Sequence, residues 1–193
     1  MYTIKRREAV KTLLENRGDL VVVAGLGAPA WDVAAAGDHE LNFPLWGAMG
    51  GAAMLGLGLA LAQPRRNIVV ITGDGEQLMG LGALATIGAQ RPPNLRLIII
   101  DNEHCGETGQ QQTHTALGVD LAAVASACGF PHVQTATAAE ELLALRQSLH
   151  ESNELLLAVI KVALTDDPFV LPPRDGAYLK NRLRRVLAAD REF

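Results

Sequence analysis

The sequence is poor in aromatic residues, in cysteine and in clustered basic charge. Aromatic residues make up only 4% of the 193 residues, whereas alanine, glycine and leucine are frequent, as in a parallel sheet covered by helices. Cys105 and Cys128 are the two cysteines, and they form neither a CxxC pair nor a disulfide framework. The net charge is −4 and the basic residues are scattered, which argues against a nucleic-acid-binding protein.

The sequence also lacks a basic N-terminal stretch followed by an apolar core, so no secretory signal is visible and we expect a cytoplasmic protein. Its length predicts a single domain over residues 1–193. Residues 43–62 carry no charge, which meets the length of a membrane span. Five glycines interrupt this segment, however, so a helix buried between a sheet and a neighbouring subunit explains it better. We therefore expect an oligomer and no membrane span.

The centre of the chain reads as a βαβ unit. Residues 68–72 and 95–100 are two apolar, β-branched runs, and residues 78–90 between them are helix-like. Such a crossover makes the two strands parallel, so their carboxyl ends lie side by side. Asp74 and Asn102, which follow the two strands, are expected at the same edge of the sheet, where open α/β sheets bind their ligands.

The chemistry of this pair points to a hard cation. Asp74 offers a carboxylate oxygen and Asn102 an amide oxygen, and both suit Mg²⁺ or Ca²⁺ rather than Zn²⁺. Gly73 and Gly75 flank the carboxylate and permit a sharp turn. The helix that follows directs free N–H groups at an anion. These features indicate a metal-diphosphate site, and the alternative is an ordinary βα turn with an N-capping aspartate.

At this point the sequence resembles a known family. The motif Gly73-Asp74-Gly75, followed by 25 residues and then Asp101-Asn102, resembles the thiamine diphosphate-binding motif of thiamine-dependent decarboxylases. Residues 45–50 and 106–113 are similar to the family's aminopyrimidine cradle and to the loop after the asparagine. The likeness is to phosphonopyruvate decarboxylases and to the β subunit of sulfopyruvate decarboxylases. It implies a doubly wound α/β fold, with a mainly parallel sheet and helices on both faces.

The resemblance implies a role for each matched residue. Asp74 and Asn102 match the side-chain ligands of Mg²⁺, and His104 matches the position whose backbone carbonyl completes the protein's share of the metal shell. The imidazole of His104 is not implied. The full set of matched cofactor-binding positions is Gly47, Met49, Gly73, Asp74, Gly75, Glu76, Asn102, His104 and Thr108.

Four of these positions would contact the cofactor itself rather than the metal. Gly75 and Glu76 match backbone donors to the diphosphate, and Gly47 matches the carbonyl that accepts from the 4′-amino group. Met49 matches the bulky residue that wedges the cofactor into its bent conformation. Because methionine fills irregular gaps, the alternative for Met49 is plain core packing.

The implied activity is decarboxylation of a small 2-oxo acid by cofactor chemistry. Members of the family use a glutamate from another lobe to activate the aminopyrimidine, and neither Glu76 nor Glu107 matches that position. The resemblance therefore assigns no catalytic residue to this chain and implies a separate α-type, pyrimidine-binding subunit. The identity of the 2-oxo acid, a carboligase outcome and a non-catalytic cofactor-binding module all remain open.

One rival motif lies earlier in the chain. Residues 25–30 fit the pattern G-x-G-x-x-A, which opens the helix of a dinucleotide-binding fold and would make the protein an NAD-binding, Rossmann-like protein. No acidic residue follows about twenty positions on at the end of a second strand, as that fold requires. Pro29 also indicates a first helical turn rather than a free phosphate-binding amide.

The rest of the chain yields expectations about loops and helix ends. We expect residues 102–115 to form a polar loop. Its candidate contacts to substrate or partner are Glu107, Thr108, Gln111, Thr113 and His114.

Residues 137–140 have the form of a capping box, residues 154–164 should be a strand, and residues 177–189 a helix. Three arginines of that helix are expected on a solvated or partner-facing edge: Arg182, Arg184 and Arg185. His39 is expected in a solvated loop, with the entrance of the site as the alternative.

Overall fold

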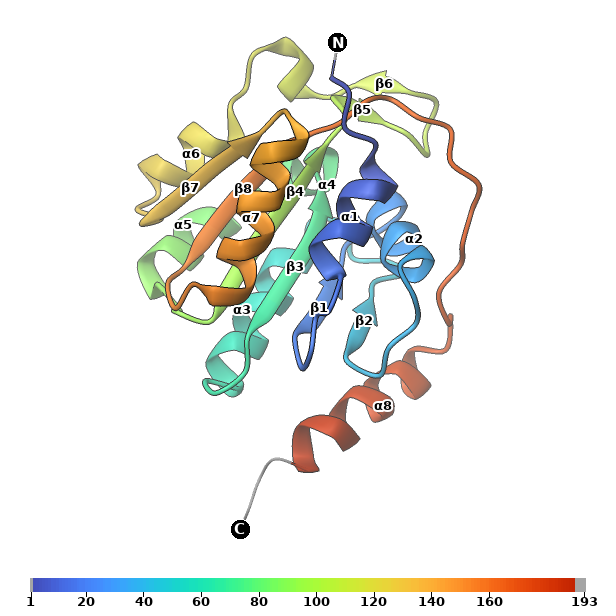
Figure 1. Cartoon of the computed structure of the whole chain (residues 1–193), viewed down its shortest axis with the longest axis vertical. Helices are drawn as coiled ribbons and strands as arrows, with labels where there is room; N and C mark the ends of the chain where they lie inside the picture. The colour runs from blue at the N-terminus through green and yellow to red at the C-terminus, as the bar shows by residue number, and fades with distance from the viewer. Residues whose placement is uncertain (1, 190–193) are drawn as a thin grey trace.

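The computed structural model describes residues 2–189 and is built around a six-stranded sheet (Figure 1). The strand order is β2-β1-β3-β4-β8-β7, and every neighbouring pair is parallel. The doubly wound α/β fold expected from the sequence is therefore confirmed. The strands are β1 (Val21–Ala24), β2 (Asn42–Pro44), β3 (Ile68–Gly73), β4 (Leu95–Asp101), β7 (His132–Ala136) and β8 (Leu156–Lys161).

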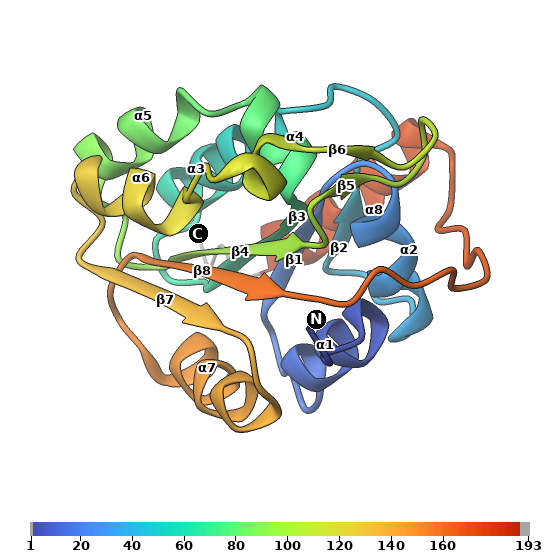
Figure 2. The same ribbon diagram turned by 90° about the horizontal axis from the view of Figure 1, so that it is seen from above.

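Helices cover both faces of this sheet (Figure 2). One face carries α1 (Arg6–Leu14), α2 (Ala28–Ala35) and α7 (Ala139–Glu151). The other carries α3 (Ala52–Ala62), α5 (Ala83–Gln90) and α6 (Leu121–Ala127), while α8 (Gly176–Ala189) packs beside β2. Alternate residues of the central strands feed the two cores, since successive side chains of a strand point to opposite faces.

The expected βαβ unit is present, but its crossover is not the single helix predicted over residues 78–90. The chain forms α4 (Asp74–Met79) and then α5, separated by a break that begins at Gly80. A Cβ atom on Gly80 would lie 2.2 Å from the carbonyl oxygen of Gly50, so the backbones of two segments pass each other here. As a result Asp74 lies in the first turn of α4, directly at the end of β3.

The predicted solvent-facing position of Arg182 is wrong. Its side chain is buried, its Nη1 lies 2.7 Å from Asp38 Oδ2, and its Nη2 donates to the carbonyl oxygen of Asn42 at 3.2 Å. The guanidinium therefore ties α8 to the start of β2. Arg184 and Arg185, on the same helix, are exposed as expected.

The polar loop predicted after β4 contains regular structure. It forms a short antiparallel hairpin, β5 (His104–Cys105) with β6 (Gln111–Gln112), and then a 3-10 turn, η1 (His114–Leu117). The predicted capping box used the wrong glutamate. Glu141 accepts from the backbone N–H groups of Thr137 and Ala138, at 2.6 and 3.1 Å, so α7 begins at Ala139.

His39 lies at the far edge of the sheet from the candidate site. His39 precedes β2, at the sheet edge opposite to the carboxyl ends of the strands, and its Nδ1 accepts from the N–H of Leu41 at 3.1 Å. It therefore does not face the site.

Across residues 2–189, none of the helices combines the length and apolar character needed to cross a membrane.

Two helical glycines give a matched test of packing. A Cβ atom on Gly88, in α5, would lie 1.9 Å from the carbonyl oxygen of Cys128, whereas one on Gly58, in α3, would meet nothing within 4 Å. We expect Gly88→Ala to lower the free energy of unfolding by about 2 kcal/mol, because backbone must move to admit the methyl group. Gly58→Ala should raise it by up to about 1 kcal/mol through helix propensity. Urea unfolding of both variants checks this, and equal effects would contradict the packing described.

Candidate functional site

The site is centred on Asp74, whose side chain is only 2% exposed at the junction of β3 and α4. Thr113 and Thr115, from the segment after the hairpin, donate their hydroxyls to Asp74 Oδ2 at 2.5 and 3.3 Å. Both hydroxyls use the same carboxylate oxygen, so Oδ1 remains the oxygen that a cation would bind. Thr113 was expected to contact substrate or partner, and this expectation is wrong because Thr113 is buried against Asp74.

The electrostatics of Asp74 favour a cation. Burial and, to a smaller extent, the nearby charge of Asp101 together raise the pKa of its carboxyl to about 6, although the hydroxyls of Thr113 and Thr115 oppose the increase. A carboxylate in such surroundings is costly unless positive charge compensates it. A divalent cation would supply that charge, so the donor set fits Mg²⁺.

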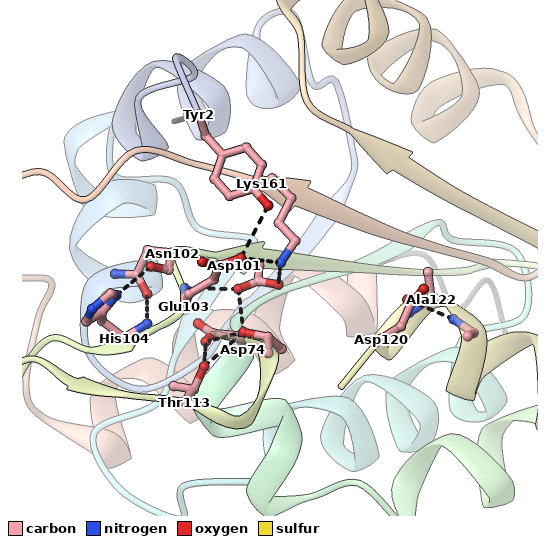
Figure 3. A network of polar contacts seen from close by, with 12 residues as sticks. Tyr2, Asp74, Asp101, Asn102, Glu103, His104, Thr113, Asp120, Ala122 and Lys161 are labelled. Atoms are coloured by element: carbon pink, nitrogen blue, oxygen red, sulfur yellow. Dashed lines mark hydrogen bonds and ion pairs between the residues drawn. The ribbon is translucent and has the colours of Figure 1, made fainter. Parts of the chain in front are cut away.

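A polar network links this carboxylate to β8 (Figure 3). Thr115 Oγ1 bridges from Asp74 to Asp101 Oδ1, which it reaches at 2.9 Å. Lys161 Nζ lies 2.8 Å from Asp101 Oδ2 and 2.9 Å from Glu103 Oε1. Lys161 therefore compensates Asp101 and Glu103, whereas Asp74 has no cationic partner among residues 2–189. Sequence reasoning missed Lys161, because it comes from a strand some sixty positions later.

Asn102 lies at the same edge as Asp74, just beyond Asp101 (Figure 3). Its Oδ1 accepts from the N–H of His104 at 3.0 Å, and its backbone carbonyl lies 2.9 Å from Nδ1 of the same histidine. The imidazole is thus occupied locally, and metal ligation by the His104 carbonyl stays a prediction. In the described part of the chain, no three His, Cys, Asp or Glu side chains gather as a metal-binding group.

Met49 is placed as a surface residue over the start of α4. Its side chain is 41% exposed, so the core-packing alternative is wrong. Its terminal carbon lies 4.0 Å from where a Cβ atom of Gly75 would be. Ala48 and Gly50, on either side of Met49, both have left-handed backbone, with φ of 56° and 89°. Gly47 is exposed just before this turn, so its carbonyl is open to a ligand.

Glu76 is the residue whose side chain the sequence did not explain. It is 3% exposed, and its Oε2 accepts from Thr72 Oγ1 at 3.0 Å, but its Oε1 has no hydrogen-bond partner. Burial raises the pKa of the carboxyl, whereas the backbone N–H groups of Leu26, Gly50 and Ala52 face it and lower the pKa. These N–H groups lie in the turn after β1 and at the start of α3, and backbone N–H groups in such positions also bind phosphate groups.

The N-terminus of α2, where the dinucleotide motif would bind phosphate, already faces a carboxylate. A Cβ atom on Gly27 would lie 1.5 Å from Glu107 Oε1, and the N–H of Ala28 donates to the same side chain. Pro29 occupies the first turn of the helix, as expected. The G-x-G-x-x-A match therefore lacks a free anion site here.

The hairpin holds the remaining predicted residues. Thr108 is exposed at its tip and donates its hydroxyl to Gln111 Oε1 at 2.8 Å, so its contact with the cofactor stays a prediction. Cys105 is half-buried, and its Sγ lies 3.3 Å from where a Cβ atom of Gly75 would be. Because Cys105 packs this closely, a side chain at Gly75, the residue after Asp74, would be crowded.

Comparison with known proteins decides the family. Residues 27–162 match the model of the C-terminal TPP binding domain of thiamine pyrophosphate enzymes, where thiamine pyrophosphate is another name for thiamine diphosphate. The chain belongs to this family. The resemblance that the motif carried is thereby confirmed, and the Met49 turn, residues 73–75 and the hairpin all lie within the matched region, which begins inside the turn after β1.

Several of the relatives that the chain resembles are named as decarboxylases. It is 39% identical to the sulfopyruvate decarboxylase subunit beta of Methanocaldococcus jannaschii, over 77% of this chain and 79% of that protein. It is 42% identical to the phosphonopyruvate decarboxylase of Streptomyces viridochromogenes, over 68% of this chain but only 33% of that protein. The solved benzoylformate decarboxylase of Polynucleobacter necessarius shares the fold, with a TM-score of 0.66 at 17% identity over 86% of this chain and 34% of that one.

Proposed function

We propose that this chain is the thiamine diphosphate- and Mg²⁺-binding subunit of a 2-oxo acid decarboxylase, active only with a separate pyrimidine-binding chain. One observation carries the proposal: a buried, uncompensated carboxylate, Asp74, lies at the same sheet edge as Asn102 in a chain of the thiamine pyrophosphate enzyme family. The relatives include a β subunit and a single protein about three times as long as the matched region. Both are named as decarboxylases, and together they support the reaction and the divided site.

In this proposal, the residues of the chain hold and orient the cofactor. Asp74, Asn102 and the carbonyl of His104 bind the metal, and the amides of Gly75 and Glu76 bind the diphosphate. When bound, the cofactor supplies the carbanion that attacks the keto carbon and the ring that takes up electrons as carbon dioxide leaves.

The direct test of the proposal is isothermal titration calorimetry of the purified chain with thiamine diphosphate. We expect binding with Mg²⁺ and its loss with excess EDTA, because the metal links the carboxylate to the diphosphate. NAD⁺, titrated under the same conditions, should not bind. Thiamine diphosphate affinity that is independent of a divalent cation would overturn the proposed site, and binding of NAD⁺ alone would favour the dinucleotide reading.

The side chain of Glu76 is expected to oppose this binding. Glu76→Gln keeps the backbone N–H of residue 76, which would bind the diphosphate, but removes a buried negative charge from the same residue. We expect the affinity for Mg²⁺-thiamine diphosphate to rise about tenfold, since like charges repel strongly in a partly buried site. Glu140→Gln, an exposed change of the same charge on α7, is the control and should leave the affinity unchanged. A lower affinity in Glu76→Gln would show that its carboxylate holds the site together.

A further inference from the structure

A cavity of about 320 Å³ lies beside the proposed cofactor site. Leu26 and Gly27 line it from the turn after β1, Leu45 and Trp46 from the segment after β2, and Glu107 from the hairpin. The C-terminal segment 165–175 closes the remaining side and contributes Arg174. Trp46 directly precedes Gly47, so one end of the cavity adjoins the position matched to the aminopyrimidine.

Arg174 is the basic residue of this lining, and its charge has no acidic partner. Within residues 2–189, the structure gives its guanidinium no carboxylate neighbour. Asp175, the next residue, instead accepts from the N–H groups of Ala177 and Tyr178 at 2.9 and 3.0 Å and thereby caps α8. A guanidinium at a cavity mouth with no internal counterion is available to an anionic ligand.

Arg174 is exposed, and a contact with Trp46 orients its side chain before any ligand binds. Its guanidinium carbon lies 4.9 Å from the centre of the Trp46 ring, a cation–π arrangement. The indole N–H of Trp46 donates to the carbonyl oxygen of Pro173 at 2.7 Å, which holds the neighbouring backbone. A preorganised side chain loses little conformational freedom on binding, so more of its interaction energy contributes to affinity.

The segment that carries Arg174 is also anchored at its other end. Arg7 Nη2 donates to the carbonyl oxygen of Pro168 at 2.8 Å. Arg6 Nε lies 3.4 Å from Asp167 Oδ2. Phe169 packs edge-on against Trp31, with ring centres 4.3 Å apart. These contacts tie the segment to α1 and α2, so the cavity has a stable wall on this side.

The distribution of charge orients a ligand in the cavity. Glu107 points at Gly27 and the N-terminus of α2, which leaves a negative charge at the end near the turn after β1. An anionic group would be repelled there and attracted to Arg174. The walls between the two charged residues are mostly apolar, which strengthens any ion pair formed inside.

We propose that Arg174 is the specificity-determining residue that selects 2-oxo acids with a second anionic group, and that this cavity receives that group. The inference rests on the proposed decarboxylase function and adds the residue that distinguishes such a substrate from pyruvate. The planar guanidinium can bind two oxygens of a sulfonate, phosphonate or carboxylate at once, which a lysine cannot reproduce.

The test uses 3-sulfopropionate as an unreactive probe, with propionate as the comparator that lacks the second anion. Both are titrated by calorimetry into the full chain, together with its partner chain where that is co-purified, after saturation with Mg²⁺-thiamine diphosphate. We expect the chain to bind 3-sulfopropionate at least about tenfold more tightly than propionate, which is typical of a hydrogen-bonded charge pair. Arg174→Gln should abolish this difference, Arg174→Lys should restore part of it, and Arg184→Gln, an exposed control on α8, should keep it in full.

The outcomes separate this inference from the proposed function. Equal affinities for the two probes in the unaltered chain, or an unchanged preference in Arg174→Gln, would overturn the role of Arg174 while cofactor binding in the same samples upholds the function. In the assembled enzyme, Arg174→Gln should raise KM for a 2-oxo acid with a second anionic group about tenfold or more, and raise KM for pyruvate much less. A merely structural role would alter both substrates alike, and that result would also contradict the proposal.

Discussion

Asp74→Asn is expected to abolish Mg²⁺-dependent binding of thiamine diphosphate and, at the same time, to stabilise the cofactor-free chain. Asparagine keeps an acceptor for Thr113 and Thr115 but removes the charge that burial and Asp101 disfavour. The pKa of Asp74 rises from 3.8 to about 6, and this shift corresponds to about 3 kcal/mol of destabilisation in the ionised folded chain. The variant should therefore melt several degrees higher than the unaltered chain at neutral pH.

The pH dependence of this stabilisation has a definite sign. Because the pKa of Asp74 is higher in the folded chain than in the unfolded one, the folded chain binds more protons between pH 3.8 and about 6. The unaltered chain thus loses stability as pH rises through that interval, and Asp74→Asn does not. The difference in melting temperature should be near zero below pH 3.8 and complete above about pH 6.

Differential scanning calorimetry without metal or cofactor measures this effect, and titration calorimetry measures the loss of binding. Asp166→Asn, at an exposed aspartate, removes the same charge and should alter neither quantity. If Asp74→Asn retained cofactor affinity, Asp74 would not be the metal ligand. If it melted lower at every pH, the carboxylate would be a structural support rather than a strained binding group.

The chain by itself is expected to bind the cofactor yet to turn over a 2-oxo acid at least about a hundredfold more slowly than the complex with an α-type chain. In the thiamine-dependent decarboxylases that the chain resembles, a glutamate from another lobe activates the aminopyrimidine, and neither Glu76 nor Glu107 matches that position. General acid–base groups typically contribute a hundredfold or more. Steady-state carbon dioxide release, measured while a candidate α-type chain is added to a fixed amount of this chain, should rise and then saturate at a fixed stoichiometry.

A matched control distinguishes a catalytic partner from a stabilising one. The same α-type chain with its activating glutamate changed to glutamine should associate equally well, and it should leave turnover at the low level of the isolated chain. Full turnover without any partner would contradict the divided site, whereas turnover absent under every condition, with cofactor binding intact, would favour a non-catalytic binding module.

The parts of the fold that could be predicted from sequence depend on local patterns. The β-branched runs at residues 68–72 and 95–100 specify buried strands, and parallel pairing through a helical crossover brings their carboxyl ends together. These two facts bring Asp74 and Asn102 to one edge without knowledge of any other contact. The start of a helix at Pro29 could likewise be predicted, because proline is favoured in a first helical turn.

The parts that could not be predicted depend on contacts between distant segments. The break after α4 exists because Gly80 passes the backbone of Gly50, and no periodicity within residues 78–90 records that encounter. The spacing of Arg182 in the sequence is typical of an arginine on the surface of a helix. It is buried only because α8 docks beside Asp38. Lys161 similarly gains its role from strand order, since β8 lies next to β4.

The uncharged helix α3 has a practical consequence for handling the protein. Met54 and Leu61 are 42% and 53% exposed on it, and Met79 and Leu117 add further apolar surface elsewhere on the molecule. Exposed apolar side chains of this kind promote self-association when no other chain covers them. The chain purified without a partner subunit should therefore precipitate as the concentration of protein or sulfate rises. Co-expression with the partner subunit, rather than refolding or added detergent, is the route to homogeneous material.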